Sequence, residues 1–234
     1  MTHRLFEGKD HASVYQKYRF TPPEELNNII LQYLSKKKGQ PHVLAVDLGC
    51  GTGQNSRLLA PHFQEVVGID ISECQLEEAR NVPGYPNITY RMGTAEDLPF
   101  PDCSVDLLTA ASAAHWFDQS RFLAEVRQVL LPYTSNRVSV ADGKLEELYS
   151  AIPFPDKERI EGVHVKSSIS VRNLVGFIET WSMFQIYKKK DPKAADELLL
   201  KTQKRFLEEM GVMSPDTEIE WKMEYFCVLA SKPG

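Results

Sequence analysis

The sequence is poor in cysteine and has no long apolar run. Its four cysteines, Cys50, Cys74, Cys103 and Cys227, lie far apart in 234 residues, without the close spacing of a redox pair or a metal site. No cluster of histidines and cysteines indicates a metal site either. No stretch is long enough to span a membrane, and no apolar signal segment follows Met1. We therefore expect free thiols, no bound metal, no membrane association and a cytoplasmic location.

An excess of positive charge is also lacking. Lys and Arg number 27 against 32 Asp and Glu, which gives a net charge of −5 at pH 7. No overall positive field is therefore available to attract a phosphate backbone, and we expect no binding to nucleic acid. The basic run at 36–38 follows a helical pattern and precedes Gly39, where cations complement a helix C-terminus. With 42% apolar and 25% charged residues, the composition is that of a globular protein.

Apolar runs alternate with helical patterns along the first half of the chain. We expect strands over residues 43–46, 66–69, 88–92 and 105–110, and helices that begin after Thr21 and Ser72 and extend over 55–60 and 122–130. This order predicts a doubly wound, mostly parallel α/β sheet that binds ligands at the carboxyl ends of its strands. We expect a single domain over 1–234, with an N-terminal segment and helix over 1–40, a core over 41–130 and C-terminal strands with a helical cap over 131–234.

One segment of this core predicts a ligand. Asp47-Leu48-Gly49-Cys50-Gly51-Thr52-Gly53 follows the first predicted strand and precedes a helix. Glycines at alternate positions let a strand turn sharply into a helix while the backbone approaches a ligand closely, which a Cβ would prevent. A dinucleotide-binding fingerprint would place a glycine at position 54, where this chain has Gln54. A nicotinamide dinucleotide is therefore disfavoured.

As a G-x-G-x-G pattern after an acidic residue, the same segment resembles motif I of the class I S-adenosylmethionine-dependent methyltransferases, which include the methyltransferase type 11 domains. The resemblance implies a Rossmann-like, seven-stranded sheet that ends in an antiparallel hairpin. It also implies S-adenosylmethionine as the cofactor, with S-adenosylhomocysteine as the product. The residues that it assigns to the cofactor are Asp47, Gly49, Gly51 and Gly53. Of these, Asp47 is expected to receive the cofactor's ammonium, directly or through water, and to hold the turn.

Two more carboxylates are predicted at the same site. Asp70 ends the second predicted strand, where a carboxylate can accept both ribose hydroxyls of an adenosyl group, with Ile71 beside it. The alternative is that Asp70 only starts the next helix. After the third strand, residues 93–100 resemble the methyltransferase segment that frames adenine, with backbone donors near Ala95 and the Glu96 carboxylate at the base edge. The alternative there is an ordinary polar loop.

After Leu130 the sequence departs from the pattern that the resemblance implies. Such a methyltransferase continues from this helix through a Pro-Gly-Gly turn into a fifth strand, but here the sequence over 131–136 is LPYTSN. Either the fifth strand is absent, which would orphan two rows of backbone donors and acceptors, or residues are missing near 130–132. We favour missing residues. Beyond the break we expect a strand over 163–170, helices over 174–187 and 192–210, and a strand over 219–230 that closes an antiparallel hairpin.

The loop after the fourth strand predicts the acceptor side of the site. Residues 111–118 would lie beside the cofactor's sulfonium, and they lack the Asn/Asp-Pro-Pro-Tyr/Phe signature of methylation on nucleic-acid bases. The segments that resemble the trans-aconitate methyltransferase-like family are His115-Trp116, Phe6, Tyr15, Tyr18 and Arg19 near the start, and Thr180-Trp181-Ser182. That resemblance implies O-methylation of a small carboxylic acid, with Tyr18, Ala111 and Trp116 at the cofactor.

Two residues are candidates for the chemistry. A carboxylate is already a nucleophile at neutral pH, so methyl transfer needs alignment and desolvation more than a strong base. We predict that His115 orients a substrate oxygen, or acts as base for a hydroxyl or amine acceptor, and its alternative is a structural role. Arg19 is the predicted carboxylate clamp, because a guanidinium binds both oxygens in a fork. It would equally suit the cofactor's own carboxylate or a surface ion pair.

Three functions remain open at this point. The first is methyl transfer to a small molecule, with an organic acid as the favoured acceptor. The second is a cofactor-binding module without turnover, and the third is methylation of protein or RNA.

Overall fold

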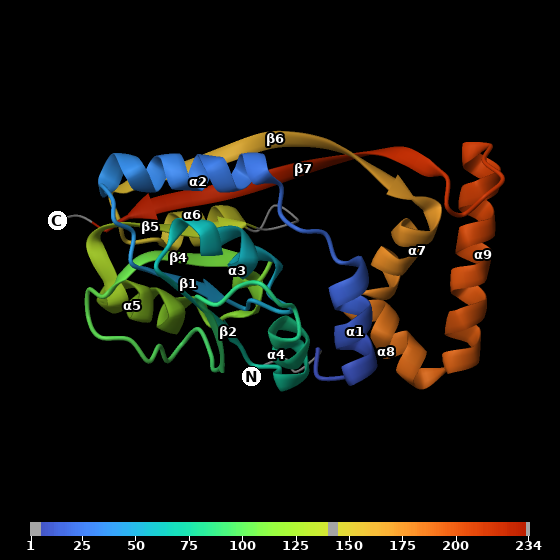
Figure 1. The fold of residues 1–234 in the computed structure, drawn as a ribbon, viewed down its shortest axis with the longest axis horizontal. Helices are drawn as coiled ribbons and strands as arrows, with labels where there is room; N and C mark the ends of the chain where they lie inside the picture. The colour runs from blue at the N-terminus through green and yellow to red at the C-terminus, as the bar shows by residue number, and fades with distance from the viewer. Residues whose placement is uncertain (1–5, 140–144, 233–234) are drawn as a thin grey trace.

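The computed structural model describes residues 6–139 and 145–232. Its strands are β1 (Leu44–Leu48), β2 (Glu65–Asp70), β3 (Ile88–Met92), β4 (Val105–Ala111), β5 (Leu130–Ser139), β6 (Asp156–Ser170) and β7 (Glu218–Ser231). They form one sheet in the order β3-β2-β1-β4-β5-β7-β6 (Figure 1). The five strands from β3 to β5 are parallel, and β7 is antiparallel to both of its neighbours. The predicted fold class is confirmed.

Nine helices accompany the sheet in the part of the chain that is described. They are α1 (Lys9–Tyr18), α2 (Glu24–Lys37), α3 (Gln54–Leu59), α4 (Glu73–Arg80), α5 (Gln119–Val129), α6 (Leu145–Ala151), α7 (Val171–Glu179), α8 (Ser182–Lys190) and α9 (Pro192–Met210), with 3-10 turns at η1 (Ala60–His62) and η2 (Ala114–Trp116). The helix after Thr21 begins later than predicted, since Pro23 occupies the N-cap position of α2 without a side-chain cap. The predicted cap of α4 is confirmed, because the Ser72 side chain accepts from the Gln75 N–H.

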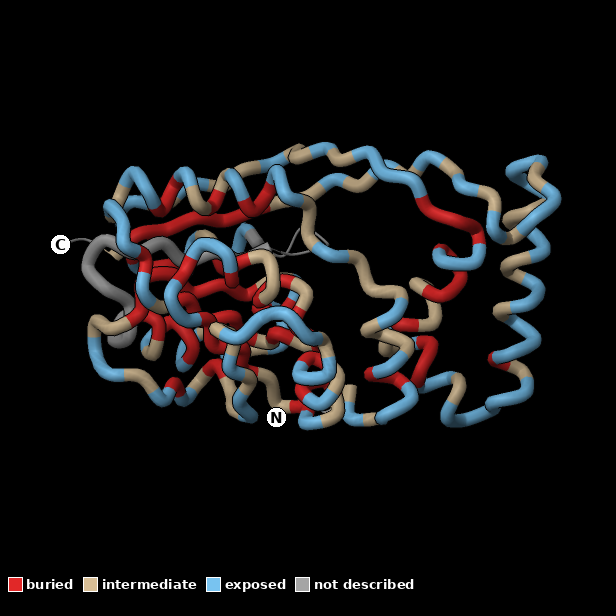
Figure 2. The backbone as a smooth tube through the Cα atoms, viewed as in Figure 1, coloured by how far each residue is buried: buried red, intermediate tan, exposed pale blue. Residues whose placement is uncertain are grey.

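Buried side chains form two cores, one on each face of the sheet. On β1, Ala45 packs with residues of α2 and α3, whereas Val46 packs with residues of α5 and α6. On β4, Leu107 and Leu108 divide in the same way. Because both faces are covered, the central strands are apolar throughout, which is why the sequence shows them as continuous runs. Figure 2 shows the burial concentrated in these strands.

The chain itself supplies the fifth strand. β5 pairs in parallel with β4 and antiparallel with β7, so it lies between them, where the fifth strand of this fold is expected. α5 passes directly into β5, and the register against β4 shifts, so that Val105 pairs with Leu130 and Leu107 with Ser135. The prediction that this strand is absent is therefore wrong. The segment is polar and shows no strand pattern in the sequence, and it is a strand because it pairs with β4 and β7. The idea that residues are missing near 130–132 stays a prediction.

The cap is carried by the long hairpin of β6 and β7. Both strands extend beyond the core, and α7, α8 and α9 lie at their far end (Figure 1). The sequence predicted one helix over 174–187, but the structure has two, because Thr180 ends α7 with its hydroxyl donating to Phe177 O (2.7 Å). α9 has its predicted bounds, with Asp191 accepting from the Ala194 N–H (3.0 Å).

The N-terminal helix α1, which the sequence analysis did not assign, joins the core to the cap. It packs against α4 on one side and α7 on the other. On the core side, the Ser72 hydroxyl donates to Phe6 O (2.7 Å). On the cap side, the buried His11 ring donates from Nε2 to Thr180 O (2.9 Å). The segment that begins at Phe6 is therefore fixed beside the carboxyl ends of β1 and β2.

Candidate active site

The segment after β1 forms the sharp turn that its spacing predicts. Gly49, Gly51 and Gly53 have φ angles of 61°, 54° and 83°, in the left-handed region that favours glycine. A Cβ on Gly49 would lie 2.5 Å from the Ala113 Cβ, and one on Gly53 would lie 2.3 Å from the Tyr90 hydroxyl. A Cβ on Gly51 would meet no atom closer than 3.6 Å. Gly49 and Gly53 therefore permit close packing, whereas Gly51 leaves space in front of the turn.

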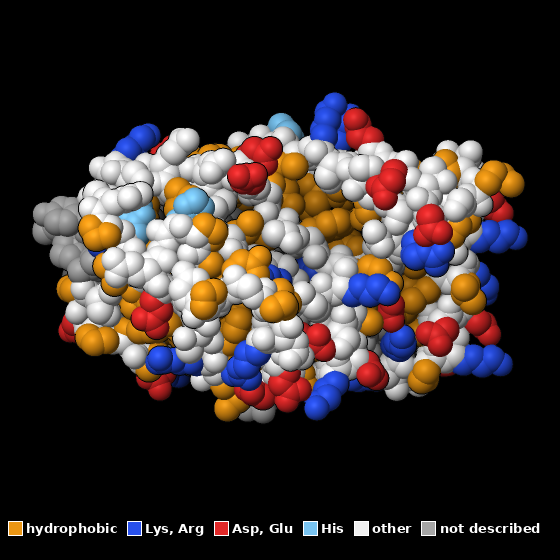
Figure 3. Space-filling view, in the orientation of Figure 1, with side chains coloured by type: hydrophobic (Ala, Val, Ile, Leu, Met, Phe, Trp, Pro, Cys, Tyr) orange, Lys and Arg blue, Asp and Glu red, His pale blue; other side chains and the backbone are white. Residues whose placement is uncertain are grey.

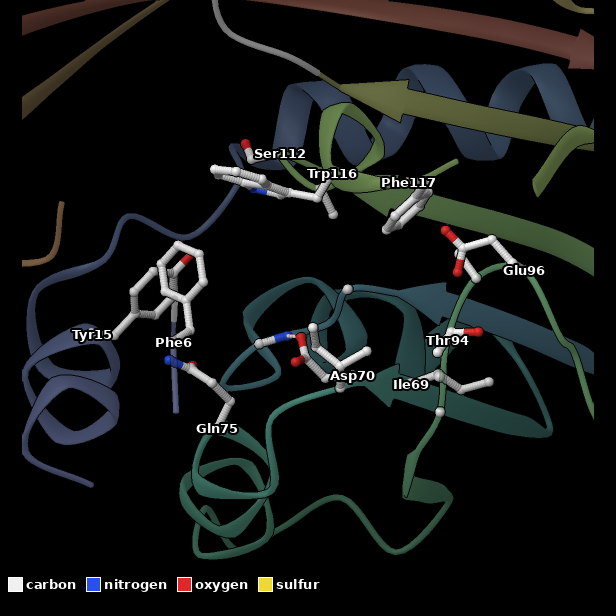
Figure 4. Close-up of a pocket in the computed structure, with 16 residues that line it drawn as sticks. Phe6, Tyr15, Ile69, Asp70, Gln75, Thr94, Glu96, Ser112, Trp116 and Phe117 are labelled. Carbon is white, nitrogen blue, oxygen red and sulfur yellow. Dashed lines mark hydrogen bonds between the residues drawn. The ribbon is translucent and has the colours of Figure 1, made fainter. Parts of the chain in front are cut away.

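That space is part of a pocket at the carboxyl ends of β1, β2 and β4, here named the first pocket (Figure 4). The space between its walls, open solvent at the mouth included, is about 800 Å³. The predicted cofactor residues that line it are Gly49, Gly51, Asp70, Ile71, Ala95, Glu96 and Trp116. The structure thus brings together most of the predicted cofactor residues, which come from four separate sequence segments.

Asp70 lies at the floor of the first pocket, held by two backbone donors. The Gly51 N–H donates to its Oδ2 (2.8 Å) and the Ser72 N–H donates to its Oδ1 (2.9 Å). Burial raises the pKa of the Asp70 carboxyl, and the two N–H donors partly oppose this by stabilising the charged form. The result is a carboxylate in a fixed orientation whose remaining lone pairs are available to a ligand.

Asp47 is buried beneath the glycine turn. Its carboxylate accepts from Asn55 Nδ2 (2.7 Å), Ser56 Oγ (2.7 Å) and Thr109 Oγ1 (2.8 Å). These bonds join the end of β1 to α3 and β4, so Asp47 holds the turn in place as the sequence predicts. Gly53 also has a structural role. It does not line the first pocket or the second pocket described below, and because it lacks a Cβ, the Tyr90 ring can pack against the turn.

Glu96 connects the loops that follow β3 and β4. Its Oε1 accepts from the Asp118 N–H (2.8 Å), while neighbouring Ala95 is buried. Figure 4 shows the Glu96 carboxylate at the opposite end of the first pocket from Tyr15, with Phe117 near it. The adenine-framing segment predicted over 93–100 therefore lies where it would meet the far end of a ligand that also contacts the glycine turn.

Aromatic rings from two distant segments cover the first pocket. The Phe6 ring lies 5.9 Å from the Tyr15 ring and 6.3 Å from the Trp116 ring, centroid to centroid. Tyr18, which was predicted to contact the cofactor, lines neither this pocket nor the adjoining one and packs against α7 instead. A Cβ on Gly176 would lie 2.5 Å from the Tyr18 ring. Tyr15, one helical turn before Tyr18 on α1, lines the first pocket instead.

Gln75 lines the first pocket, although no sequence pattern assigned it to the site. Its side chain is 2% exposed, and neither Oε1 nor Nε2 has a hydrogen-bond partner among the described residues. A buried primary amide without partners is costly. Gln75 therefore offers both a donor and an acceptor at the wall of the first pocket. The signal in the sequence was its position five residues after Asp70, one turn into α4.

A second pocket adjoins the first, and the two share Tyr15, Gly49 and Ser112. Arg19 and Ala111 line the second pocket, as does Asp47. The Arg19 guanidinium lies 5.1 Å from the Tyr15 ring centroid and 5.4 Å from that of Phe177. No Asp or Glu in the described part of the chain forms an ion pair with it. Arg19 is thus positioned by two aromatic rings at the edge of the site.

His115 is not brought into either pocket. Its side chain is exposed, and its ring packs beside Trp116 with 4.7 Å between centroids. The 3-10 turn η2 directs Trp116 toward the pocket and His115 away from it, because adjacent residues of such a turn point in different directions. At the position predicted for His115, the structure instead has Ser112, which lines both pockets.

Residues 46–133 match the family described as a methyltransferase domain. These residues are therefore a methyltransferase domain of the class I type. Over 147 residues it is 36% identical to the O-methyltransferase resE of Aspergillus sclerotiorum, a match that covers 55% of this chain and 54% of that protein. The chain spans about a third to a half of the length of the curated relatives it matches. S-adenosylmethionine is the cofactor of this family, as predicted.

Solved structures share the fold of this methyltransferase domain. A candidate type II methyltransferase from Anaeromyxobacter dehalogenans aligns with a TM-score of 0.66 at 23% identity, covering 92% of this chain and 99% of that one. The phosphoethanolamine N-methyltransferase 2 of Haemonchus contortus, solved with S-adenosylmethionine, aligns with a TM-score of 0.60 at 17% identity, covering 99% of this chain and 59% of that one. These comparisons do not confirm the narrower resemblance to the trans-aconitate methyltransferase-like family.

The methyltransferase domain has groups that fit S-adenosylmethionine. Gly51 leaves the space that a ligand needs in front of the turn, Asp70 offers oriented carboxylate lone pairs, and the buried amide of Gln75 has both polar atoms unused by the described residues. No group of three or more His, Cys, Asp or Glu suited to a metal occurs over 6–139 and 145–232. Over the same ranges, no helix has the length and apolarity to cross a bilayer.

Proposed function

We propose that this protein transfers the methyl group of S-adenosylmethionine to an oxygen of a small organic acid. The observation that carries the proposal is the position of Arg19. It lines the second pocket, which shares Tyr15, Gly49 and Ser112 with the cofactor pocket, and no carboxylate among the described residues pairs with it. A guanidinium at that boundary suits an acceptor carboxylate, which it can bind through both oxygens.

The residues of the first pocket have separate roles in this proposal. Asp70 accepts from the ribose hydroxyls, while Glu96 and the backbone near Ala95 meet the adenine edge. Asp47 lines the second pocket beside Gly49 and receives the ammonium of the methionyl group, directly or through water. The rings that cover the pocket exclude water from the reacting atoms, which strengthens the electrostatic interactions within it.

The reaction requires no general base. When bound, S-adenosylmethionine supplies a methyl group on a cationic sulfur, so that a carboxylate oxygen forms a C–O bond as the C–S bond breaks and the electron pair remains on sulfur. The negative acceptor and the positive donor become a neutral ester and a neutral thioether. Arg19 aligns the acceptor, and Ser112, at the junction of the pockets, lies beside the line of transfer.

The relatives support a small acceptor. One is named as an O-methyltransferase, and a structural neighbour is named for phosphoethanolamine, a small molecule. No observation favours a module without turnover or a protein or RNA acceptor. The four free cysteines, two of them buried, suit a reducing compartment, and we place the activity in the cytoplasm.

The test is a transfer assay with S-adenosylmethionine labelled on the methyl group and pools of small organic acids. We expect label in a product from which base releases methanol, as a methyl ester does, and none with the Gly51→Val variant. Label that resists base would indicate N-methylation and contradict the proposal. Binding of the cofactor without transfer to any pool would instead support a module without turnover.

A further inference from the structure

Four aromatic rings form a connected group near Arg19, whose guanidinium lies 5.4 Å from the centroid of one of them, the Phe177 ring. The Phe20 ring lies 4.4 Å from the Phe177 ring and 5.9 Å from the Trp221 ring, and the Phe177 ring lies 5.9 Å from that of Trp181. We name Phe20, Phe177, Trp181 and Trp221 the aromatic wall. Phe20 comes from the α1–α2 linker, Phe177 and Trp181 from α7 and the α7–α8 junction, and Trp221 from β7, so the fold gathers the rings from three separate segments.

The aromatic wall meets the second pocket at Phe20. Phe20 lines that pocket together with Arg19, and both also line a third pocket on their other side. Trp181 is 42% exposed, so the wall is accessible rather than buried in a core. Figure 3 shows a hollow with hydrophobic side chains between the sheet and the cap helices, over the region of the α1–α2 linker. Exposed aromatic surface beside a concave site is typical of a ligand-binding face.

The charges around the wall leave one positive group for a ligand. Among the described residues lining the second pocket, Arg19 is the one cation and Asp47 the one anion. The Asp47 carboxylate accepts from three donors of the protein, and the proposed function assigns its remaining capacity to the cofactor's ammonium. The third pocket is lined by Lys17, which lies over the Tyr18 ring (4.9 Å), and by Glu218 as well as by Arg19. A single guanidinium suits one carboxylate, whereas a tricarboxylic acid would leave two carboxylates facing aromatic rings without a partner.

We infer that the acceptor is a monocarboxylic acid with a flat, apolar body, which lies on the aromatic wall while Arg19 holds its carboxylate toward Ser112. The inference rests on the proposed function and specifies its substrate class. It departs from the small polar acid that the trans-aconitate resemblance implies. The body would displace water from the wall, and the carboxylate oxygen would form the ester C–O bond at the boundary of the two pockets, with the C–S electron pair remaining on the cofactor sulfur.

Calorimetric titration of the protein saturated with S-adenosylhomocysteine tests this class without turnover. The probes are trans-cinnamate, with one carboxylate and a flat body, its neutral isostere cinnamamide, and trans-aconitate, a small tricarboxylic acid. We expect cinnamate to bind about tenfold more tightly than either of the others. Equal or tighter binding of trans-aconitate would overturn the inference. So would equal binding of cinnamamide, which would show that the guanidinium recognises no carboxylate.

Substitutions distinguish the contribution of the aromatic wall to binding from that of the Arg19 guanidinium. Arg19→Met should weaken cinnamate about tenfold and leave cinnamamide unchanged, while Trp181→Leu and Phe177→Leu should weaken both. Trp181 is exposed, so its variant keeps the test valid if Phe177→Leu unfolds, and Lys204→Met on α9 serves as a control that should change nothing. Unchanged cinnamate binding in Trp181→Leu would contradict the claim that the aromatic wall binds the body of the acid.

Methyl transfer separates this inference from the proposed function. Base-labile methylation of trans-aconitate but not of cinnamate would keep the proposed function and overturn the inference. Cinnamate binding with no methyl transfer to any acid would keep the assigned ligand class and overturn the proposed function.

Discussion

The backbone N–H of Gly51 donates to the carboxylate of Asp70, with 2.8 Å between Gly51 N and Asp70 Oδ2. This contact joins the turn after β1 to the end of β2. Because adjacent parallel strands bring their carboxyl ends to the same edge of a sheet, two sequence segments that lie 19 residues apart form one wall of the first pocket. The bond also fixes which face of the carboxylate remains open to a ligand.

Replacement of Gly51 by valine should abolish cofactor binding. The branched side chain would enter the space in front of the turn, and a φ of 54° is strained for any residue with a Cβ. We expect a loss of affinity of about a hundredfold or more in a titration with S-adenosylhomocysteine. Gly84→Val is the matched control, since Gly84 also has a positive φ but lies in open space outside both pockets. Retained affinity in Gly51→Val would refute the assignment of the turn.

The cofactor half of the site could be predicted because its signals are local. Gly49, Gly51 and Asp70 lie at ends of strands that the sequence marks by apolar runs, and strand order then brings them together. Tyr15 and Gln75 were not among the predicted cofactor residues, because their places depend on contacts between α1, α4 and α7, which no local pattern encodes. For the same reason the sequence favoured Tyr18, one helical turn away.

The C-terminal half was harder to predict. β5 is a strand because β4 and β7 flank it, not because its own residues alternate. The helical periodicity over 174–187 continues across Thr180 and Trp181, so the break between α7 and α8 has no signal in the apolar pattern. Pairing with distant strands thus determines β5, and a side-chain hydrogen bond from Thr180 accompanies the break between α7 and α8.

Cofactor affinity should fall in acid as Asp70 becomes protonated. Ribose hydroxyls donate to the charged carboxylate, so affinity is complete above the pKa of Asp70 and is lost as the pH falls through it. Because burial raises that pKa above the ordinary 3.8, the loss should begin at a higher pH than for an exposed aspartate.

Titration of S-adenosylhomocysteine across acidic pH measures this effect. Asp70→Asn should bind weakly with no such dependence, and the same steep pH profile in that variant would assign the dependence to another group. The stability of the free protein should show the opposite trend. Ionisation of a carboxyl whose folded pKa is raised lowers stability, so this contribution is favourable at low pH and is lost as the pH rises through that pKa.

Loss of the Arg19 side chain should affect the acid more than the cofactor. Arg19→Ala should raise KM for the acid roughly tenfold to a hundredfold, because a charged hydrogen-bonded pair contributes about 1.5–3 kcal/mol. Arg19→Lys should restore only part of this, because an ammonium cannot form the bidentate fork. If Arg19→Ala instead weakens S-adenosylhomocysteine more than the acid, the guanidinium belongs to the cofactor's carboxylate.

Gly53→Ala should destabilise the fold more than Gly84→Ala. Both positions have a positive φ, which costs an L-residue about 1–2 kcal/mol. At Gly53 the new Cβ would also overlap the Tyr90 ring and hydroxyl, and overpacking adds roughly 1–3 kcal/mol. Denaturant unfolding of the two variants measures the difference, and equal losses would mean that Tyr90 moves aside without cost.

Substitution of His115 by alanine should leave most of the activity. The side chain is exposed and lines neither pocket, and a carboxylate acceptor needs no base. We expect kcat to change by less than about threefold at neutral pH. A loss of about a hundredfold, together with a new pH dependence of kcat, would restore His115 to a catalytic role.

The most direct test of the central claim follows the methyl group itself. The protein is incubated with S-adenosylmethionine carrying ¹³C in the methyl group and with an organic acid, and the labelled methyl is observed by NMR. We expect the cofactor's methyl resonance to be replaced by that of a methyl ester, with one S-adenosylhomocysteine formed for each ester. A methyl resonance on nitrogen, or an unchanged cofactor resonance in a protein that binds both ligands, would contradict it.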